Sequence, residues 1–274
     1  MTELSQWQRL LKNVGVWQGS FTRLSATGEL QANSPSCVTL EPLNQGQTMR
    51  QTIRQFTEAE ETYSRVLEYS SLNRGTLFFA DGSFSQGSLQ FGPLSEFGAE
   101  FGFIAQDRRL RLVQQFDKDS QLAQFTLIRE HRQGSSGAER PPLTPDQLVG
   151  EWQGEAVTLY PDWRESPSYP TRLKITLQDN QLTQQLSLPE LAFTSRARVE
   201  GSLLLFEQGR HPIQVLLLPD GASANTPLRL PPSQPFLLEA GWLIQDQLRQ
   251  RMIRSYDAKG EWVSLTLVTE RKLV

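Results

Sequence analysis

The hydrophobic pattern along the chain is that of short β-strands separated by turns. Arg172–Leu177 alternates apolar and polar side chains with period two, as a strand with one buried face does. Gln181–Leu188 follows after the turn-forming pair Asp179-Asn180, which predicts a hairpin. Thr76–Ala80 and Gln214–Leu218 are further predicted strands that lead into Asp-Gly turns. Many short strands with few helical patterns predict an all-β sandwich or barrel.

The chain also repeats itself. Val14–Gly19 and Val149–Gly154 share the pattern V-G-x-W-Q-G, and an Asp-Gly pair follows in each half. Arg111–Arg132 aligns without gaps on Arg251–Lys272, and the identical residues include Glu130 in one copy and Glu270 in the other. Matches that occur in the same order and nearly the same register predict an internal duplication.

A small, polar, proline-ended segment lies between the two copies. We therefore predict an N-terminal domain at 1–134, a linker at 135–142 and a C-terminal domain at 143–274. Each domain is predicted to begin with a short helical segment, Ser5–Val14 in the first and Leu143–Leu148 in the second.

Composition excludes several classes of protein. The net charge is −3 and the charges are interspersed, so we expect no nucleic-acid partner. No segment approaches the roughly 18 apolar residues that span a bilayer, and the N-terminus does not resemble a secretory signal. The single cysteine, Cys37, excludes an intramolecular disulfide and fits a reducing compartment. We expect a cytoplasmic protein.

Two short motifs carry a resemblance to a known superfamily. Gly15–Trp17 and Gly150–Trp152 resemble the Gly-x-Trp signature that opens the first strand of calycins. The resemblance implies two tandem antiparallel calycin, or lipocalin-like, β-barrels, in which Trp17 and Trp152 close the barrel and a basic side chain of the last strand covers each. A cation over an indole contributes about 0.5–2 kcal/mol. The candidate basic side chains are Arg129 or Arg132 in the first copy and Arg271 or Lys272 in the second.

Longer segments are similar to a cyanobacterial family of unknown function built from two calycin-like halves. They are Phe78–Gly87, Phe97–Phe103 and Arg251–Asp257. The Arg-x-x-Arg stretch that begins at Arg251, with a following strand that ends in Glu270-Arg271, is also similar to the chromophore lyases of phycobiliproteins. Those lyases are single calycin barrels. The resemblance implies a pigment or a protein of the photosynthetic apparatus as partner.

Few residues are candidates for catalysis or metal binding. The chain has two histidines, His131 and His211, and no Cys/His cluster, so we predict no metal site. His131 is expected at a solvated strand end, while His211 in a loop stays open as a haem ligand. Cys37 has no basic partner in its own segment. We predict no catalytic residue and no cofactor.

The arginines are the charges of greatest interest. Arg109 and Arg111 in the first copy, and Arg249, Arg251 and Arg254 in the second, are expected on or near strands that precede the final turn. In an alternating strand Arg249 and Arg251 share one face. Pointing inward, they would bind an acid group such as a fatty-acid or bilin carboxylate. We expect them to point outward instead, because barrel exteriors hold most charges. The candidate ligand-binding set is Trp242, Arg249, Arg251, Phe101 and Phe103, of which the three aromatic residues are expected to line a core or a pocket. Glu130 and Glu270 are expected to form structural salt bridges.

Three hypotheses of function follow. The first is a non-enzymatic protein whose barrel binds a tetrapyrrole, a carotenoid or a fatty acid. The second is a bilin lyase or chaperone that acts on a phycobiliprotein, which leaves the question of enzymatic activity open. The third is an assembly factor that docks to a protein and binds no small ligand. Colour on purification and co-purifying proteins discriminate among the three.

Overall fold

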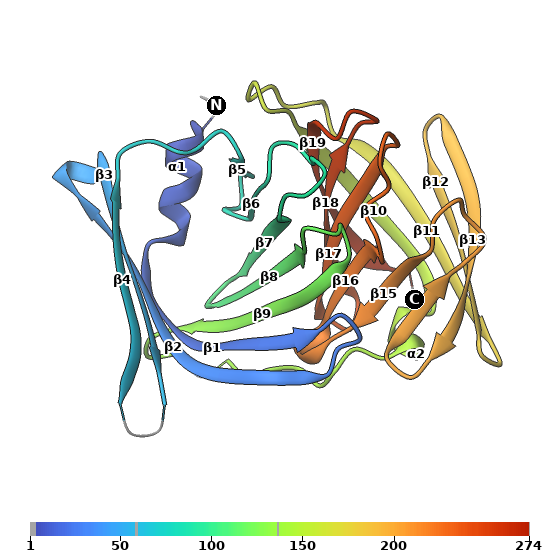
Figure 1. Cartoon of the computed structure of the whole chain (residues 1–274), viewed down its shortest axis with the longest axis horizontal. Helices are drawn as coiled ribbons and strands as arrows, with labels where there is room; N and C mark the ends of the chain where they lie inside the picture. Colours follow the sequence, from blue (N-terminus) through green and yellow to red (C-terminus); the bar gives the residue numbers. More distant parts are fainter. Residues whose placement is uncertain (1–3, 58–59, 136, 274) are drawn as a thin grey trace. The chain divides into compact units, whose positions relative to one another are not determined.

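The computed structural model describes residues 4–57, 60–135 and 137–273 (Figure 1). They form two compact units. The first comprises the chain up to Gly87 with Ala99–Val113 and Gln124–Ala138, and the second comprises Ser88–Gly98, Gln114–Ala123 and the chain from Glu139 onward. The second unit therefore includes polypeptide from the first repeat. The domain limits at 1–134, 135–142 and 143–274 stay a prediction, and Ser136 of the predicted linker lies outside the described residues.

The sheet of the first repeat has nine strands in the order β4-β3-β2-β1-β9-β8-β7-β6-β5. Its strands are β1 (Gly15–Ser25), β2 (Leu30–Leu43), β3 (Thr48–Phe56), β4 (Glu61–Tyr69), β5 (Thr76–Phe78), β6 (Phe84–Gly87), β7 (Phe97–Ala105), β8 (Arg108–Phe116) and β9 (Leu122–Arg132). The sheet curls strongly but ends at β4 and β5, which makes it an open half-barrel (Figure 1).

The second repeat forms a closed barrel of ten strands. They are β10 (Gly150–Leu159), β11 (Tyr169–Gln178), β12 (Gln181–Leu188), β13 (Leu191–Glu200), β14 (Leu203–Phe206), β15 (Ile213–Leu217), β16 (Ala222–Pro227), β17 (Phe236–Gln245), β18 (Leu248–Tyr256) and β19 (Trp262–Lys272). Pairing of β19 with β10 closes the barrel. The prediction of an all-β chain with tandem barrel-type sheets is confirmed, and the difference between the copies is that only the second sheet closes on itself.

A helix explains how the β5 edge of the first sheet is satisfied. The side chain of Gln6, in α1 (Gln6–Leu10), accepts a hydrogen bond from Phe78 N at 2.7 Å and donates one to Phe78 O at 3.1 Å. Gln6 thus occupies the donor and acceptor of Phe78 as a neighbouring strand would. The side chain of Gln6 therefore caps the β5 edge at Phe78.

Short helices stand at the start of each repeat, as predicted. The first segment is α1 with the 3-10 turn η1 (Leu11–Asn13), and the second is α2 (Pro145–Leu148). In both, a glutamine side chain accepts from the backbone of the N-cap residue, Gln8 from Ser5 and Gln147 from Thr144. The remaining 3-10 turns are η2 (Asn44–Gly46) and η3 (Pro219–Gly221). Within the described residues no helix has the length and apolarity to cross a membrane.

A tryptophan anchors each helical segment to its sheet. Trp17 Nε1 donates to Asn13 O and Trp152 Nε1 donates to Leu148 O, both at 2.9 Å. Each indole is fully buried within an apolar cluster. The surrounding apolar residues are Leu10, Val38, Leu40 and Met49 in the first unit, and Leu148, Leu173, Ile175 and Leu182 in the second. Burial of side chains of this kind stabilises by about 1.5–3 kcal/mol each.

Aromatic packing holds the two first-repeat segments within the second unit. The Phe97 ring lies 5.0–6.2 Å from the rings of Phe91, Phe116, Phe236 and Tyr256. Tyr256 OH donates to Ser88 O at 2.9 Å, and Leu122 N donates to Leu228 O at 3.0 Å. Such aromatic pairs contribute about 0.5–1.5 kcal/mol each beyond area burial. The second unit therefore depends on residues that precede its own repeat.

Candidate functional site

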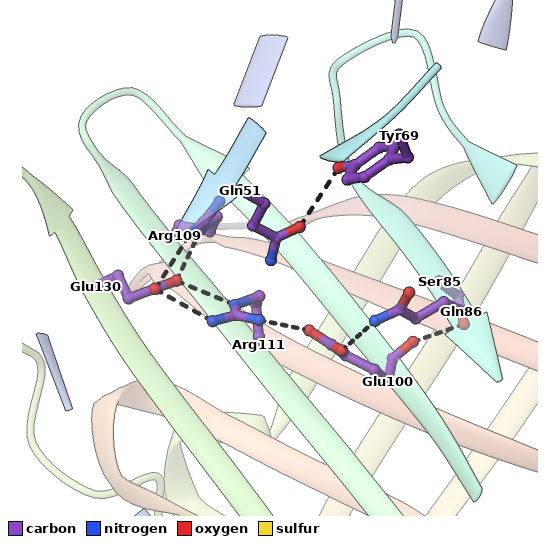
Figure 2. Close-up of polar contacts among 8 residues, drawn as sticks. All are labelled: Gln51, Tyr69, Ser85, Gln86, Glu100, Arg109, Arg111 and Glu130. Carbon is purple, nitrogen blue, oxygen red and sulfur yellow. Dashed lines mark hydrogen bonds and ion pairs between the residues drawn. The ribbon is translucent and has the colours of Figure 1, made fainter. Parts of the chain in front are cut away.

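A buried ion network lies on the concave face of the first sheet. Arg109 in β8 binds Glu130 in β9 through two hydrogen bonds, Nε–Oε2 at 2.7 Å and Nη2–Oε1 at 3.0 Å. Arg111 binds the same two oxygens, with Nε at 3.1 Å and Nη2 at 3.2 Å (Figure 2). The carboxylate of Glu130 therefore accepts four hydrogen bonds from two guanidinium groups, which is the strong, planar form of this interaction.

The network continues through β7 and β6. Arg111 Nη1 donates to Glu100 Oε1 at 2.8 Å, and Gln86 Nε2 donates to Glu100 Oε2 at 2.6 Å. Ser85 Oγ donates to the carbonyl of Glu100 at 2.7 Å (Figure 2). Two arginines face two glutamates, so the network is electrically balanced.

A tyrosine borders this network on the side of β3 and β4. Tyr69 OH donates to Gln51 Oε1 at 3.3 Å (Figure 2). Burial raises the pKa of Tyr69, and the positive charge of Arg109 opposes part of that rise. The phenol is therefore held in its neutral, hydrogen-bond-donating form.

The closing tryptophan lies between two cations. The guanidinium carbon of Arg109 is 4.5 Å from the Trp17 ring centroid and that of Arg132 is 4.4 Å from it. Strand pairing explains the placement, because Trp17 is directly opposite Arg132, and Gly19, two residues on, is directly opposite Glu130. The tryptophan of the Gly-x-Trp motif therefore lies on the same face of the sheet as Glu130, one row away from it.

The protonation states follow from burial and charge together. Burial alone would raise the pKa of Glu130, but the charges and hydrogen bonds of Arg109 and Arg111 outweigh it and lower that pKa. Burial lowers the pKa of Arg109 in spite of Glu130. The pKa of Arg111 is raised, because its two carboxylate partners outweigh burial. Charged, paired side chains are the consistent description of the network.

The second unit repeats this network with the same residue types. Arg249 Nε donates to Glu270 Oε1 at 2.5 Å, and Arg251 Nε donates to that same oxygen at 3.0 Å. Arg251 Nη1 binds Glu239 Oε1 at 3.1 Å. Burial would raise the pKa of Glu270, and the two arginines outweigh it and lower that pKa, as for Glu130.

The predicted outward orientation of Arg249 and Arg251 is wrong. Both point inward with Glu270, and Arg249 is buried. The physical reason is that the two neighbouring strands supply carboxylates on the same face, so the charges are paired within the barrel rather than solvated.

The structure does not bring the predicted aromatic residues to the arginines. Phe101, Phe103 and Trp242 are buried, and they alternate along their strands with Glu100 and Glu239, which face the ion networks. Successive side chains of a strand point to opposite faces. The three aromatic residues therefore pack on the other face of each sheet.

Lys272, rather than Arg271, lies over the second tryptophan. Its Nζ is 5.0 Å from the Trp152 ring centroid, and strand pairing sets Lys272 directly opposite Trp152. Arg271 is exposed. In the first unit Arg129 binds the hydroxyl of Thr22 at 3.0 Å and Arg132 takes the position over the indole. The gapless alignment of the repeats sets Arg132 on Lys272, and it could have identified these two residues as the ones over the tryptophans.

Sequence reasoning missed the second carboxylate of each network. Glu100 and Glu239 stand at equivalent positions in the two copies, and this repetition of an acidic residue inside a buried strand was the available signal. The other singled-out residues lie elsewhere. Cys37 is half-buried, His131 stands near the end of β9, and His211 Nε2 is 3.0 Å from Gln234 Oε1. In the part of the chain that the structure describes, no group of three or more potential ligands is arranged for a metal.

Comparison with known proteins identifies the family. Residues 3–135 match the N-terminal domain of unknown function DUF3598. A crystal structure of a DUF3598 protein of unknown function from Nostoc punctiforme is 50% identical, with a TM-score of 0.94, and covers 99% of this chain and 100% of that one. The chain belongs to the DUF3598 family. In this DUF3598 protein, residues 139–273 also match the C-terminal domain of the biogenesis factor required for ATP synthase 1.

More distant likenesses were also found. The S-type phycobiliprotein lyase CpeS from Guillardia theta is 12% identical to the DUF3598 chain, with a TM-score of 0.35, over 47% of this chain and 90% of that one. No curated protein matches the chain.

Proposed function

We propose that this DUF3598 protein is an assembly factor that acts by binding a protein partner, and that the partner is a subunit of ATP synthase. The observation that carries the proposal is the match of residues 139–273 to the C-terminal domain of a biogenesis factor required for ATP synthase. That match covers the whole closed barrel, from α2 to β19.

The ion networks support a role that does not depend on an acidic ligand. Arg249 and Arg251, the residues suited to hold a carboxylate, are already paired with Glu270 and Glu239. A fatty acid or a bilin propionate that takes the place of one of these glutamates would leave that glutamate buried without its partner. Breaking a buried ion pair in that way costs about 3–5 kcal/mol. This cost disfavours acidic ligands and favours a function of the protein's exterior surface.

One exterior feature suits protein docking. Strand β4 forms an end of the first sheet and has β3 as its neighbour in the strand order, and most of its side chains are exposed. Val66, on the outer face of β4, is 57% exposed. An open strand edge of nine residues can accept an extended segment of another protein through main-chain hydrogen bonds. We assign this edge to an extended segment of the ATP synthase subunit.

The test is direct binding. The full chain is titrated by biolayer interferometry against each purified ATP synthase subunit of the same organism, and assembled ATP synthase is quantified in a strain that lacks the gene. Saturable binding to one subunit and a loss of assembled enzyme are expected. Absence of binding to every subunit, with normal assembly in the deletion strain, would overturn the proposal.

A matched pair of variants tests the edge. Val66→Lys places a charge on β4, as natural edge strands do to prevent pairing, and is expected to weaken binding at least about tenfold. Val263→Lys is the control, because Val263 is 40% exposed on β19, which has a neighbour on both sides in the closed barrel. Equal binding by both variants would rule out β4 as the docking edge.

The pigment hypotheses make a different prediction. A bilin carrier or lyase would purify with colour or would shift the absorption of added bilin, whereas the assembly factor purifies colourless and leaves bilin absorption unchanged. The absorption spectrum of the protein before and after addition of bilin decides between them.

A further inference from the structure

Four residues of the closed barrel stand side by side in one row across its sheet. Thr171 in β11 is directly opposite Gly154 in β10, Gly154 is opposite Glu270 in β19, and Glu270 is opposite Arg249 in β18. Directly opposed residues point to the same face of a sheet, and Arg249 and Glu270 set that face as the interior. We refer to Thr171, Gly154, Glu270 and Arg249 as the polar row.

Three polar atoms of this row are buried without a hydrogen-bond partner among the residues that the structure describes. They are Thr171 Oγ1, Glu270 Oε2 and Arg249 Nη2. Thr171 and Glu270 flank the glycine, since Thr171 Oγ1 and Glu270 Cβ lie 2.7 and 2.8 Å from the position that a Cβ would take on Gly154. Buried polar atoms are almost always paired in folded proteins, so three neighbouring exceptions indicate a site.

The equivalent row of the first unit has its carboxylate and its guanidinium group fully paired. It consists of Ser36, Gly19, Glu130 and Arg109, and strand pairing aligns Gly19 with both Ser36 and Glu130. Glu130 and Arg109 use all the corresponding atoms on each other and on Arg111. Ser36 Oγ is the one atom of this row that is buried without a partner among the described residues. The open carboxylate oxygen and guanidinium nitrogen are therefore a property of the second barrel.

The balance of charges decides the class of ligand. Arg249 and Arg251 face Glu270 and Glu239, so these four charges balance, and Lys272, which lies over the same indole as Arg249, donates its Nζ to Gln147 O at 2.8 Å. The open positions comprise one guanidinium NH2 group, one carboxylate oxygen and one hydroxyl, and Asn225 Oδ1 beside Glu239 is a further open acceptor. Hydroxyl groups both donate and accept, and thus match this mixture of donors and acceptors.

The inward face of the barrel becomes apolar and exposed on the side of β12 and β13. Along β13 the inward-facing residues rise from 1% exposed at Ala197 to 44% at Phe193 and 55% at Leu191. Leu191 is directly opposite Leu188 in β12. The residue before Leu188 is Ser187, which is opposite Arg172, the neighbour of Thr171 in β11. Solvent therefore reaches apolar side chains of the concave face next to the row.

From these observations we propose that the polar row of the second barrel binds the head of a neutral, hydroxylated amphiphile. The hydroxyl groups of the head bond to Thr171, Glu270 and Arg249, and the apolar part lies against Phe193 and Leu188. This function is additional to protein docking and does not depend on it, because the row lies on the inner face of the barrel.

The probe is n-octyl-β-D-glucoside below its micellar concentration, with octanoate as the matched anionic chain. Isothermal titration calorimetry and native mass spectrometry of the full chain are expected to show one glucoside bound per chain and no octanoate. Absence of saturable glucoside binding would overturn the proposal, since water alone would then satisfy the row. Equal binding of octanoate would overturn the assignment to a neutral head.

Paired variants locate the site. Thr171→Val removes the hydroxyl without a change in shape and is expected to weaken glucoside binding about 2- to 10-fold, the effect of one hydrogen bond. Thr171→Ser keeps the hydroxyl and is expected to bind as the parent chain does. Ser36→Ala is the control in the first unit and leaves binding unchanged. Weakening by Ser36→Ala, or full binding by Thr171→Val, would contradict the assignment. Thermal unfolding of each variant verifies that it is folded.

Discussion

The two ion networks of this chain use the same residue types at equivalent positions, yet their hydrogen bonds differ. In the first unit Glu130 accepts four hydrogen bonds through both of its oxygens. In the second, Glu270 Oε1 accepts from both arginines, while Glu270 Oε2 and Arg249 Nη2 have no partner within the described part of the chain. Duplication has preserved the charge pairs but not their geometry. A balanced buried charge is required for folding, whereas a complete set of hydrogen bonds is required only where no ligand supplies the rest.

The glycines beside the glutamates differ in the same way. A Cβ on Gly19 would collide with the backbone carbonyl of Arg129, so the main chains of β1 and β9 approach too closely for any side chain. A Cβ on Gly154 would instead meet side-chain atoms of Thr171 and Glu270. The first unit needs glycine for strand contact, and the second needs it for the convergence of two polar side chains.

The largest expected effect comes from removal of the central carboxylates. Glu130→Leu and Glu270→Leu each leave two buried arginines short of a partner and are expected to destabilise the protein by about 3–5 kcal/mol. The Glu130 variant lies at the upper end, because it loses four hydrogen bonds. Chemical denaturation measures both, with exposed Glu190→Leu as the control. A larger loss for Glu270→Leu would refute the difference between the two networks.

Acidification tests the same carboxylates without a change in shape. The folded-state pKa of Glu130 and of Glu270 is lowered from the ordinary value of 4.5. The stability that each contributes is thus complete above about pH 4.5 and is lost as the pH falls through the folded pKa. Denaturation curves between pH 7 and pH 3 are expected to show a steep loss below 4.5. Glu130→Gln and Glu270→Gln should each reduce that dependence, and an unchanged slope in either variant would remove its carboxylate from the network.

The smallest effect separates the two cations over the tryptophans. Arg132→Met is expected to cost about 1–2 kcal/mol, because Arg132 stacks on Trp17 and also donates to Val14 O at 2.7 Å. Lys272 Nζ also donates to a backbone oxygen, Gln147 O, at 2.8 Å, but burial lowers the pKa of Lys272, so Lys272→Met should cost less, about 0.5 kcal/mol. Thermal unfolding and tryptophan fluorescence measure both variants. Equal costs would indicate that the cation's identity does not matter at this position.

Local patterns in the sequence determined the class of fold. Period-two alternation predicted the hairpin of β11 and β12, and the repeat of V-G-x-W-Q-G predicted two copies that each begin with a short helix and a tryptophan strand. These features depend on residues that are close in sequence, such as Ser5 and Gln8 of the helix cap. They can therefore be predicted from the sequence of one chain. The alignment of the two repeats also showed that Arg132 and Lys272 occupy equivalent positions.

The tertiary structure alone decided the remaining features. The inward direction of Arg249 depends on which neighbouring strand carries Glu270, and a shift of register by one residue would have sent it outward. The cap on the β5 edge of the first sheet depends on Gln6 reaching Phe78, far along the chain. The inclusion of Ser88–Gly98 in the second unit depends on aromatic contacts with Phe236 and Tyr256. Each is a contact between distant segments, whose free energy exists only after the sheet has set its register.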